Sequence, residues 1–252
     1  MLDLLGRPRL AVAIGLTGAV AIAWLYLVPL SRDMYGAMTG PSAWMMQADW
    51  DARYFALMFW MWAVMMVGMM LPSAAPAILL FARVLQRSPG AEAPVARSYA
   101  FASGYLIAWA AFSVGATLLQ WQLARAALLS PMMESATPVL GAVILVAAGL
   151  YQWTSVKQEC LLHCRAPAEF LTQRFRPGLR GALRMGVEHG IHCVGCCWVL
   201  MGLLFVGGVM QLTWIAAITI FVLLEKLAPF GAQLGRVGGA LLVSAGVALL
   251  LR

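Results

Sequence analysis

YFALMFWMWAVMMVGMMLPSAAPAILLFA, residues 54–82, is a run of 29 residues without a charged side chain. Because about 20 apolar residues carry a helix across the hydrocarbon core of a bilayer, this run predicts a membrane-spanning helix. The whole chain has the same character: 63% of its 252 residues are hydrophobic, 11% are charged, and the mean hydropathy is +0.85. Soluble domains carry about 25% charged residues. The composition therefore excludes a cytosolic enzyme, a disordered chain and a secreted disulfide scaffold.

Seven apolar segments follow one another along the chain, separated by short gaps rich in charged residues, proline or glycine. They cover 10–30, 54–82, 98–120, 137–156, 184–208, 212–229 and 237–251. The pattern predicts an all-α, polytopic helical membrane bundle of about seven transmembrane helices in a single domain, residues 1–252, with an outer loop at 31–52 and a basic cytoplasmic loop at 157–183. Because Pro229 and several glycines interrupt the last two segments, six spans with one re-entrant segment is the alternative.

The positions of the basic residues predict the orientation of the bundle. With the N-terminus in the cytoplasm, 13 of the 17 Lys and Arg residues fall on the cytoplasmic side, and the exceptions are Arg32, Arg53, Arg125 and Arg252. Cytoplasmic loops of membrane proteins carry such an excess of basic residues. Membrane topology therefore explains the net charge of +7, and we expect a lipid bilayer rather than nucleic acid as the partner of this basic chain.

All five cysteines and all three histidines lie in two short windows. One is Cys160-Leu-Leu-His163-Cys164, and the other is His189-Gly-Ile-His192-Cys193-Val-Gly-Cys196-Cys197. On a helix these spacings place the side chains on one face, and thiolate and imidazole are ligands for copper, zinc or an iron–sulfur cluster. A lone Cys or His in a membrane helix is usually a packing residue. The concentration of all eight predicts metal binding or, because Cys193 and Cys196 are spaced as CxxC, a redox dithiol.

Six methionines within 13 residues mark the segment 54–82. Four of them share one face of the predicted helix: Met58, Met61, Met65 and Met69. Such a stripe by itself is ordinary packing, since methionine is a flexible core residue. Beside the Cys and His residues it predicts a lane of thioether ligands, which favours Cu(I) over zinc or iron.

The methionine stripe and the second Cys/His window lie at similar depths in the predicted membrane, because one segment enters from outside and the other from inside. We therefore expect a sulfur of Met65 or Met69 within reach of Cys193 or Cys196. An open outer loop gives little packing reason for Met45, so this residue is a further candidate for collecting copper.

Two acidic residues, Glu188 and Glu225, fall within apolar segments. Ionisable residues inside a membrane are candidates for function. The alternative is that each lies near the cytoplasmic interface and forms an ion pair with a neighbour, Glu188 with Arg184 and Glu225 with Lys226.

Three stretches resemble a known family: Trp62-Ala-Val-Met-Met-Val-Gly-Met-Met-Leu-Pro-Ser73, Cys160-Leu-Leu-His-Cys-Arg-Ala-Pro167 and His189-Gly-Ile-His-Cys-Val-Gly-Cys-Cys-Trp198. Together with Leu223-Leu-Glu-Lys226, they are similar to the bacterial family labelled domain of unknown function 2182, whose members are described as predicted metal-binding integral membrane proteins. The likeness covers most of residues 50–230. It implies a metal site and a bacterial membrane protein, and it implies nothing about a reaction or a substrate.

These patterns predict a multi-pass protein of the bacterial inner membrane that binds Cu(I) for transport, chaperoning or cofactor assembly. Its partner would be a metallochaperone or a membrane complex, and no enzyme activity is assigned. The expected metal ligands are Cys160, His163, Cys164, His189, His192, Cys193, Cys196 and Cys197, joined by Met58, Met61, Met65 and Met69. Eight Cys and His ligands exceed one site, which predicts two sites or a small cluster. The alternatives are a membrane thiol oxidoreductase and an accessory structural subunit of a larger respiratory or photosynthetic complex.

Overall fold

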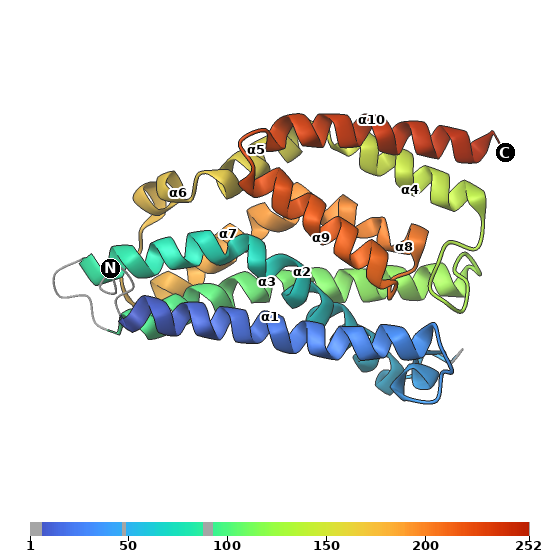
Figure 1. Ribbon diagram of the computed structural model, residues 1–252, viewed down its shortest axis with the longest axis horizontal. Helices are drawn as coiled ribbons and strands as arrows, with labels where there is room; N and C mark the ends of the chain where they lie inside the picture. Colours follow the sequence, from blue (N-terminus) through green and yellow to red (C-terminus); the bar gives the residue numbers. More distant parts are fainter. Residues whose placement is uncertain (1–6, 47–48, 88–92, 252) are drawn as a thin grey trace.

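The computed structural model describes residues 7–46, 49–87 and 93–251 of the chain. Within these ranges it contains helices and no strand, which confirms the predicted all-α bundle. Successive long helices alternate in direction, and the first and last helices place their free ends at opposite ends of the elongated bundle (Figure 1). Arg252 and positions 47–48 of the predicted outer loop lie outside the described ranges.

The helices follow the apolar segments closely. They are α1 (Arg7–Met34), α2 (Ala52–Arg87), α3 (Pro94–Arg125), α4 (Pro138–Tyr151), α5 (Ser155–Arg165), α6 (Pro167–Arg174), α7 (Gly178–Gly202), α8 (Leu204–Gly207), α9 (Leu212–Leu227) and α10 (Gly231–Leu250), with a short 3-10 helix η2 (Pro41–Met46).

Fewer helices than expected are long enough to cross a membrane. Among the described residues five are long and apolar enough, namely α1, α2, α3, α10 and the segment Gly178–Gly207. α4 and α5 make a sixth crossing if they are one span, bent by 64° at the break between them. Thr154 begins α5 by accepting a hydrogen bond from the N–H of Lys157. α9 has 16 residues, about 24 Å, which is shorter than the ~30 Å hydrocarbon core. By length and composition, the described residues therefore contain five or six candidate membrane spans rather than seven.

The segment 157–183, predicted as a basic loop, is mostly helical. It contains the end of α5, all of α6 and the start of α7. Two residues counted among the cytoplasmic basic residues are buried inside the bundle: Lys157 is 0% exposed, and Lys226 is 5% exposed. This region also contains Leu161, Phe170 and Leu171, which are buried against the other helices.

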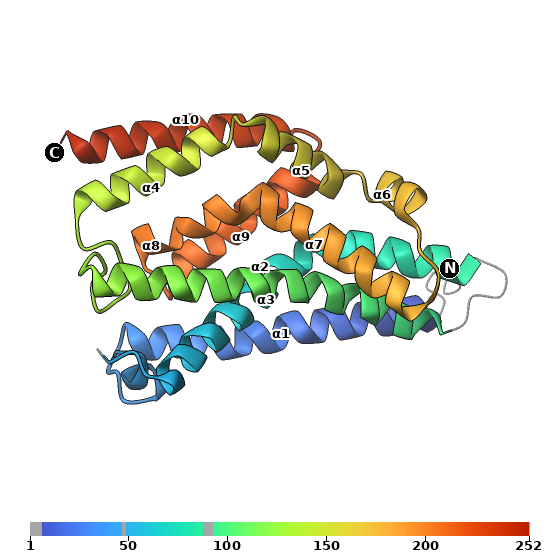
Figure 2. The ribbon, with the colours of Figure 1, turned by 180° about the vertical axis from the view of Figure 1, so that it is seen from behind.

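α2 lies in the middle of the bundle and contacts α1, α3 and α9 (Figures 1 and 2). All six methionines between positions 58 and 70 are fully buried. Met45 is also buried, and the hydroxyl of Tyr54 donates a hydrogen bond to the Met45 carbonyl over 2.7 Å. Packing is therefore enough to explain a methionine at position 45, although the sequence predicts an open loop there.

α3 and α7 pack closely because two glycines face the opposite backbone. Gly104 on α3 faces the backbone of α7, and Gly186 on α7 faces the carbonyl of Phe101 on α3. A Cβ atom at either position would overlap these backbone atoms. Small residues allow such close approach between membrane helices, and here the approach brings Tyr105 of α3 against Cys193 of α7.

Candidate functional site

Four thiols come together where α5 meets α7, and we call them the thiol cluster: Cys164, Cys193, Cys196 and Cys197. The three from α7 are at most 1% exposed, because their i, i+3, i+4 spacing turns them toward the bundle interior. Cys164 on α5 is half-buried, and its side chain approaches those of Cys193 and Cys196. The structure thus brings four of the predicted thiol ligands together from two helices.

The α7 thiols are turned back onto their own helix. Both Cys196 and Cys197 donate to the carbonyl oxygen of Cys193, over 3.1 and 2.9 Å. In this arrangement no three Cys, His, Asp or Glu side chains within the described ranges form a ready ligand set for a metal ion. Each cysteine sulfur can rotate about its Cα–Cβ bond. A change of rotamer would therefore give a different arrangement of the sulfur atoms.

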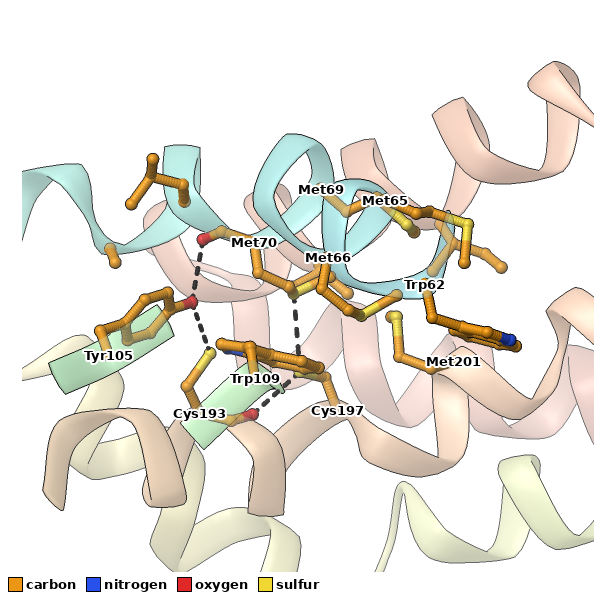
Figure 3. Packing of buried hydrophobic residues seen from close by; sticks show 14 of the residues in the cluster. Trp62, Met65, Met66, Met69, Met70, Tyr105, Trp109, Cys193, Cys197 and Met201 are labelled. Atoms are coloured by element: carbon orange, nitrogen blue, oxygen red, sulfur yellow. Dashed lines mark hydrogen bonds between the residues drawn. The ribbon is translucent and has the colours of Figure 1, made fainter. Parts of the chain in front are cut away.

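A thioether contacts the thiol cluster from α2. The Met70 sulfur lies 3.9 Å from the sulfur of Cys197, and Figure 3 shows Met70 and Met66 on the side of α2 that faces these cysteines. Met65 and Met69 lie on another side of the helix in the same view. The methionine segment meets the second Cys/His window as expected, but the sulfur contact is made by Met70, which does not belong to the predicted one-face stripe.

A buried ammonium group lies against the thiol cluster. Lys226 Nζ on α9 is 2.8 Å from the sulfur of Cys193 and 3.2 Å from the hydroxyl of Ser73. The Tyr105 hydroxyl lies on another side of the same sulfur at 3.0 Å, and it donates to the Met70 carbonyl over 2.9 Å. The surroundings of Cys193 are therefore polar on several sides within an otherwise apolar core.

Sequence reasoning missed Lys226 as part of the site. The signal was available, since an ionisable residue within an apolar segment is a candidate for function. It was assigned instead to an ion pair with Glu225. In the structure Glu225 pairs with Lys157 at 2.7 Å. Glu188 pairs with Arg176 at 2.8 Å and approaches the expected Arg184 at 3.6 Å.

The Lys157–Glu225 ion pair holds α5 against α9. Both side chains are at most 1% exposed. Arg165, also on α5, donates to the Glu225 carbonyl over 2.6 Å. Because α5 carries Cys164, these contacts fix one wall of the thiol cluster.

The remaining predicted ligands lie apart from the thiol cluster. The ring of His189 packs among Phe101, Phe170 and Tyr105, with ring centroids 5.4–5.9 Å away. Cys160 faces the backbone of Gly195. The eight Cys and His residues therefore share one region of α5 and α7 but point to different sides of it.

Two histidines form a separate pair on the outside of the α5–α7 contact. The rings of His163 and His192 stack with centroids 4.3 Å apart and an angle of 24° between their planes. His163 is exposed, and His192 is half-buried. This pair and the thiol cluster are carried by the same two helices.

The four methionines of the predicted stripe are all fully buried. Met58 accepts a hydrogen bond at its sulfur from the Gln120 amide over 3.6 Å, and Trp62 donates to the oxygen of the same amide over 2.7 Å. α2 thus carries thioethers on several sides because other helices surround it.

No curated protein and no solved structure matches this chain. One protein family does: PpoB2, described as a copper chaperone, matches residues 59–249. The matched range contains the thiol cluster, Met70, Lys226 and the histidine pair. The family match indicates a copper-related role, whereas the likeness to domain of unknown function 2182 stays a prediction. The chain belongs to the PpoB2 copper chaperone family.

Proposed function

We propose that this protein carries Cu(I) as cargo in the thiol cluster, with Met70 as an additional thioether ligand, and delivers it to a copper-dependent partner. The proposal rests above all on one contact, between the sulfur atoms of Met70 and Cys197 at 3.9 Å. Thiolate and thioether sulfur together suit Cu(I), while Zn²⁺ and iron–sulfur clusters do not call for thioether. The family match also supports a copper-related role.

The charge of the site supports a monovalent ion. Two thiolates with one Cu(I) leave one net negative charge, and the Lys226 ammonium beside Cys193 balances it. The same thiolates with a divalent ion are already neutral, so Lys226 would add an uncompensated positive charge. An unbalanced buried charge costs several kcal/mol. A cationic side chain within the bundle therefore favours Cu(I) held by two thiolates.

Copper binding requires the α7 thiols to leave the Cys193 carbonyl. Each thiol loses its proton when it binds a metal, and a thiolate no longer donates to a carbonyl oxygen. The hydrogen bonds that hold Cys196 and Cys197 against the helix are then lost, and both sulfur atoms are free to rotate toward Met70 and Cys164. Deprotonation and ligand rearrangement are coupled in this account.

The methionines of α2 provide a path of soft ligands toward the other end of the bundle. Met58, Met61, Met65 and Met69 are buried one turn after another, and each thioether is a weak Cu(I) ligand. In this proposal copper collected at the outer face moves along them to Met70 and the thiol cluster. The protein would lie in the bacterial inner membrane with its N-terminus in the cytoplasm.

X-ray absorption spectroscopy on protein loaded anaerobically with Cu(I) tests the ligand set. The expected spectrum is that of Cu(I) with sulfur ligands at the first equivalent of copper. Met70→Leu should remove the thioether and weaken binding, while Met185→Leu is a matched control because Met185 is equally buried on α7. A first equivalent bound only by nitrogen and oxygen ligands would contradict the proposal.

A thiol oxidoreductase is a second candidate function, favoured by the 2.8 Å contact between Lys226 and Cys193. A cation beside a thiol compensates the charge of its thiolate, which is the reactive form. Cys164 would be the second thiol of the pair. Mass spectrometry after mild oxidation distinguishes the two: a reversible Cys164–Cys193 disulfide that turns over a dithiol substrate supports catalysis, and its absence supports cargo binding.

A further inference from the structure

We infer that His163 and His192 form a second copper station, through which the ion leaves the buried thiol cluster toward a partner. The inference rests on the proposed Cu(I) function and assigns a separate role to two side chains that do not belong to the thiol cluster. Their stacked rings lie on the outer side of the contact between α5 and α7.

The hydrogen bonds of the two rings fix where each can bind a metal. Nδ1 of His163 lies 2.9 Å from the Glu159 carbonyl, and Nδ1 of His192 lies 2.7 Å from the Glu188 carbonyl. A carbonyl oxygen only accepts, so each Nδ1 carries the hydrogen and each neutral ring keeps its lone pair on Nε2. Metal-binding histidines commonly donate their other ring nitrogen to a carbonyl in this way.

The two Nε2 atoms are available for a ligand. Across the described part of the chain neither accepts a hydrogen bond from a protein group. A cleft of about 290 Å³ opens beside His163, and Glu169, Gln173 and Arg174 contribute polar side chains to its lining. His163 is therefore accessible from a polar surface, whereas the α7 thiols are at most 1% exposed.

The chain connects the two stations directly. His163 precedes Cys164 on α5, and His192 precedes Cys193 on α7. Neighbouring residues on a helix point about 100° apart. Each helix thus presents an imidazole on the outer side of the contact and a thiol on the inner side, at the same height. A copper ion crosses from one pair to the other by exchanging imidazole for thiolate ligands.

Such a relay solves a problem of access. A buried site with sulfur ligands holds Cu(I) tightly, but the ligands of a partner protein cannot reach an ion that is fully enclosed. An exposed imidazole pair holds the ion more weakly and leaves coordination positions open for a partner. The thiol cluster then sets how much copper is bound, and the histidine pair sets how fast it exchanges.

The kinetic test compares release of Cu(I) to a water-soluble chelator from the parent and from His163→Phe/His192→Phe. Phenylalanine keeps two stacked rings on the surface and removes both nitrogen lone pairs. The variant should retain the same copper content while exchange slows by about 10-fold or more. His189→Phe is the matched control, because His189 packs among aromatic rings away from the pair and its replacement should leave the rate unchanged.

A second measurement uses the unaltered protein and does not depend on how a variant folds. With ¹⁵N-labelled histidine, added Cu(I) should shift the Nε2 resonances of His163 and His192 before that of His189. Unmoved resonances, or a double variant that exchanges as fast as the parent, would overturn the relay and leave the proposed cargo function standing. A parent that binds no Cu(I) would overturn both.

Discussion

The ammonium nitrogen of Lys226 lies 2.8 Å from the sulfur of Cys193, deep in the bundle, although the two residues belong to different helices. Lys226 also contacts the hydroxyl of Ser73 on α2, so a single side chain joins α2, α7 and α9. The Tyr105 hydroxyl from α3 completes the surroundings of the same sulfur. The central cysteine of the site is thus held by the packing of four helices.

Lys226→Met should weaken Cu(I) binding, because the variant loses the positive charge that balances a copper–dithiolate unit. A hydrogen bond to a charged group contributes about 1.5–3 kcal/mol, which is roughly a 10- to 100-fold change in affinity. Competition with a chelator of known affinity measures the change. Lys226→Arg keeps the charge and should lose less; equal affinity for parent and Lys226→Met would contradict the role of the charge.

Met70→Leu should lower the affinity for Cu(I) with little loss of stability, since leucine and methionine have similar volumes and such swaps usually cost less than about 1.5 kcal/mol. Met185→Leu is the control, because Met185 is equally buried but is not among the proposed copper ligands. Copper titrations should separate the two variants. Identical affinities would mean that Met70 is a packing residue.

Lys157→Met should destabilise the protein, because it leaves the Glu225 carboxylate buried without its partner. Breaking a buried ion pair from one side costs about 3–5 kcal/mol. Thermal unfolding in detergent measures the loss. Lys157→Met/Glu225→Met removes both charges and should recover most of the stability; a double variant as unstable as the single one would argue against an unpaired charge as the cause.

Gly186→Ala should loosen the contact between α3 and α7, since the added Cβ atom meets the Phe101 carbonyl. Overpacking of this kind costs about 1–3 kcal/mol. Gly115→Ala on α3 is the control, because nothing lies within 4 Å of a Cβ atom there, and alanine favours a helix by up to about 1 kcal/mol over glycine. The two melting temperatures should therefore move in opposite directions.

Much of the fold followed from the sequence because hydrocarbon imposes a simple rule on the chain. Each predicted apolar segment is mostly helical in the structure, and the run at 54–82 lies within α2. What the rule does not give is helix length. α9 is short and the α4–α5 pair is bent, and both features depend on local breaks such as the turn before Thr154.

The site was predictable in its residue types and less so in its geometry. The clustering of Cys193, Cys196 and Cys197 followed from helical spacing, since these positions share a face of α7, whereas the approach of Cys164 depends on the packing of α5 against α7. The spacing did not reveal that His189 belongs to an aromatic core or that Lys226 reaches Cys193 from a distant segment. Such contacts depend on how α9 and α3 pack against α7, and the spacing of residues within one segment does not predict that packing.

The central claim is that the thiol cluster holds copper, and elemental analysis of anaerobically purified protein tests it most directly. Parent protein loaded with Cu(I) and the variant Cys193→Ser/Cys196→Ser/Cys197→Ser would be compared for metal content per chain, with circular dichroism to establish that both are equally helical. The parent should carry copper, and the variant should lose most of it because serine oxygen is a poor ligand for a soft ion. Full copper content in the helical triple variant, or a parent that carries no copper after loading, would contradict the account.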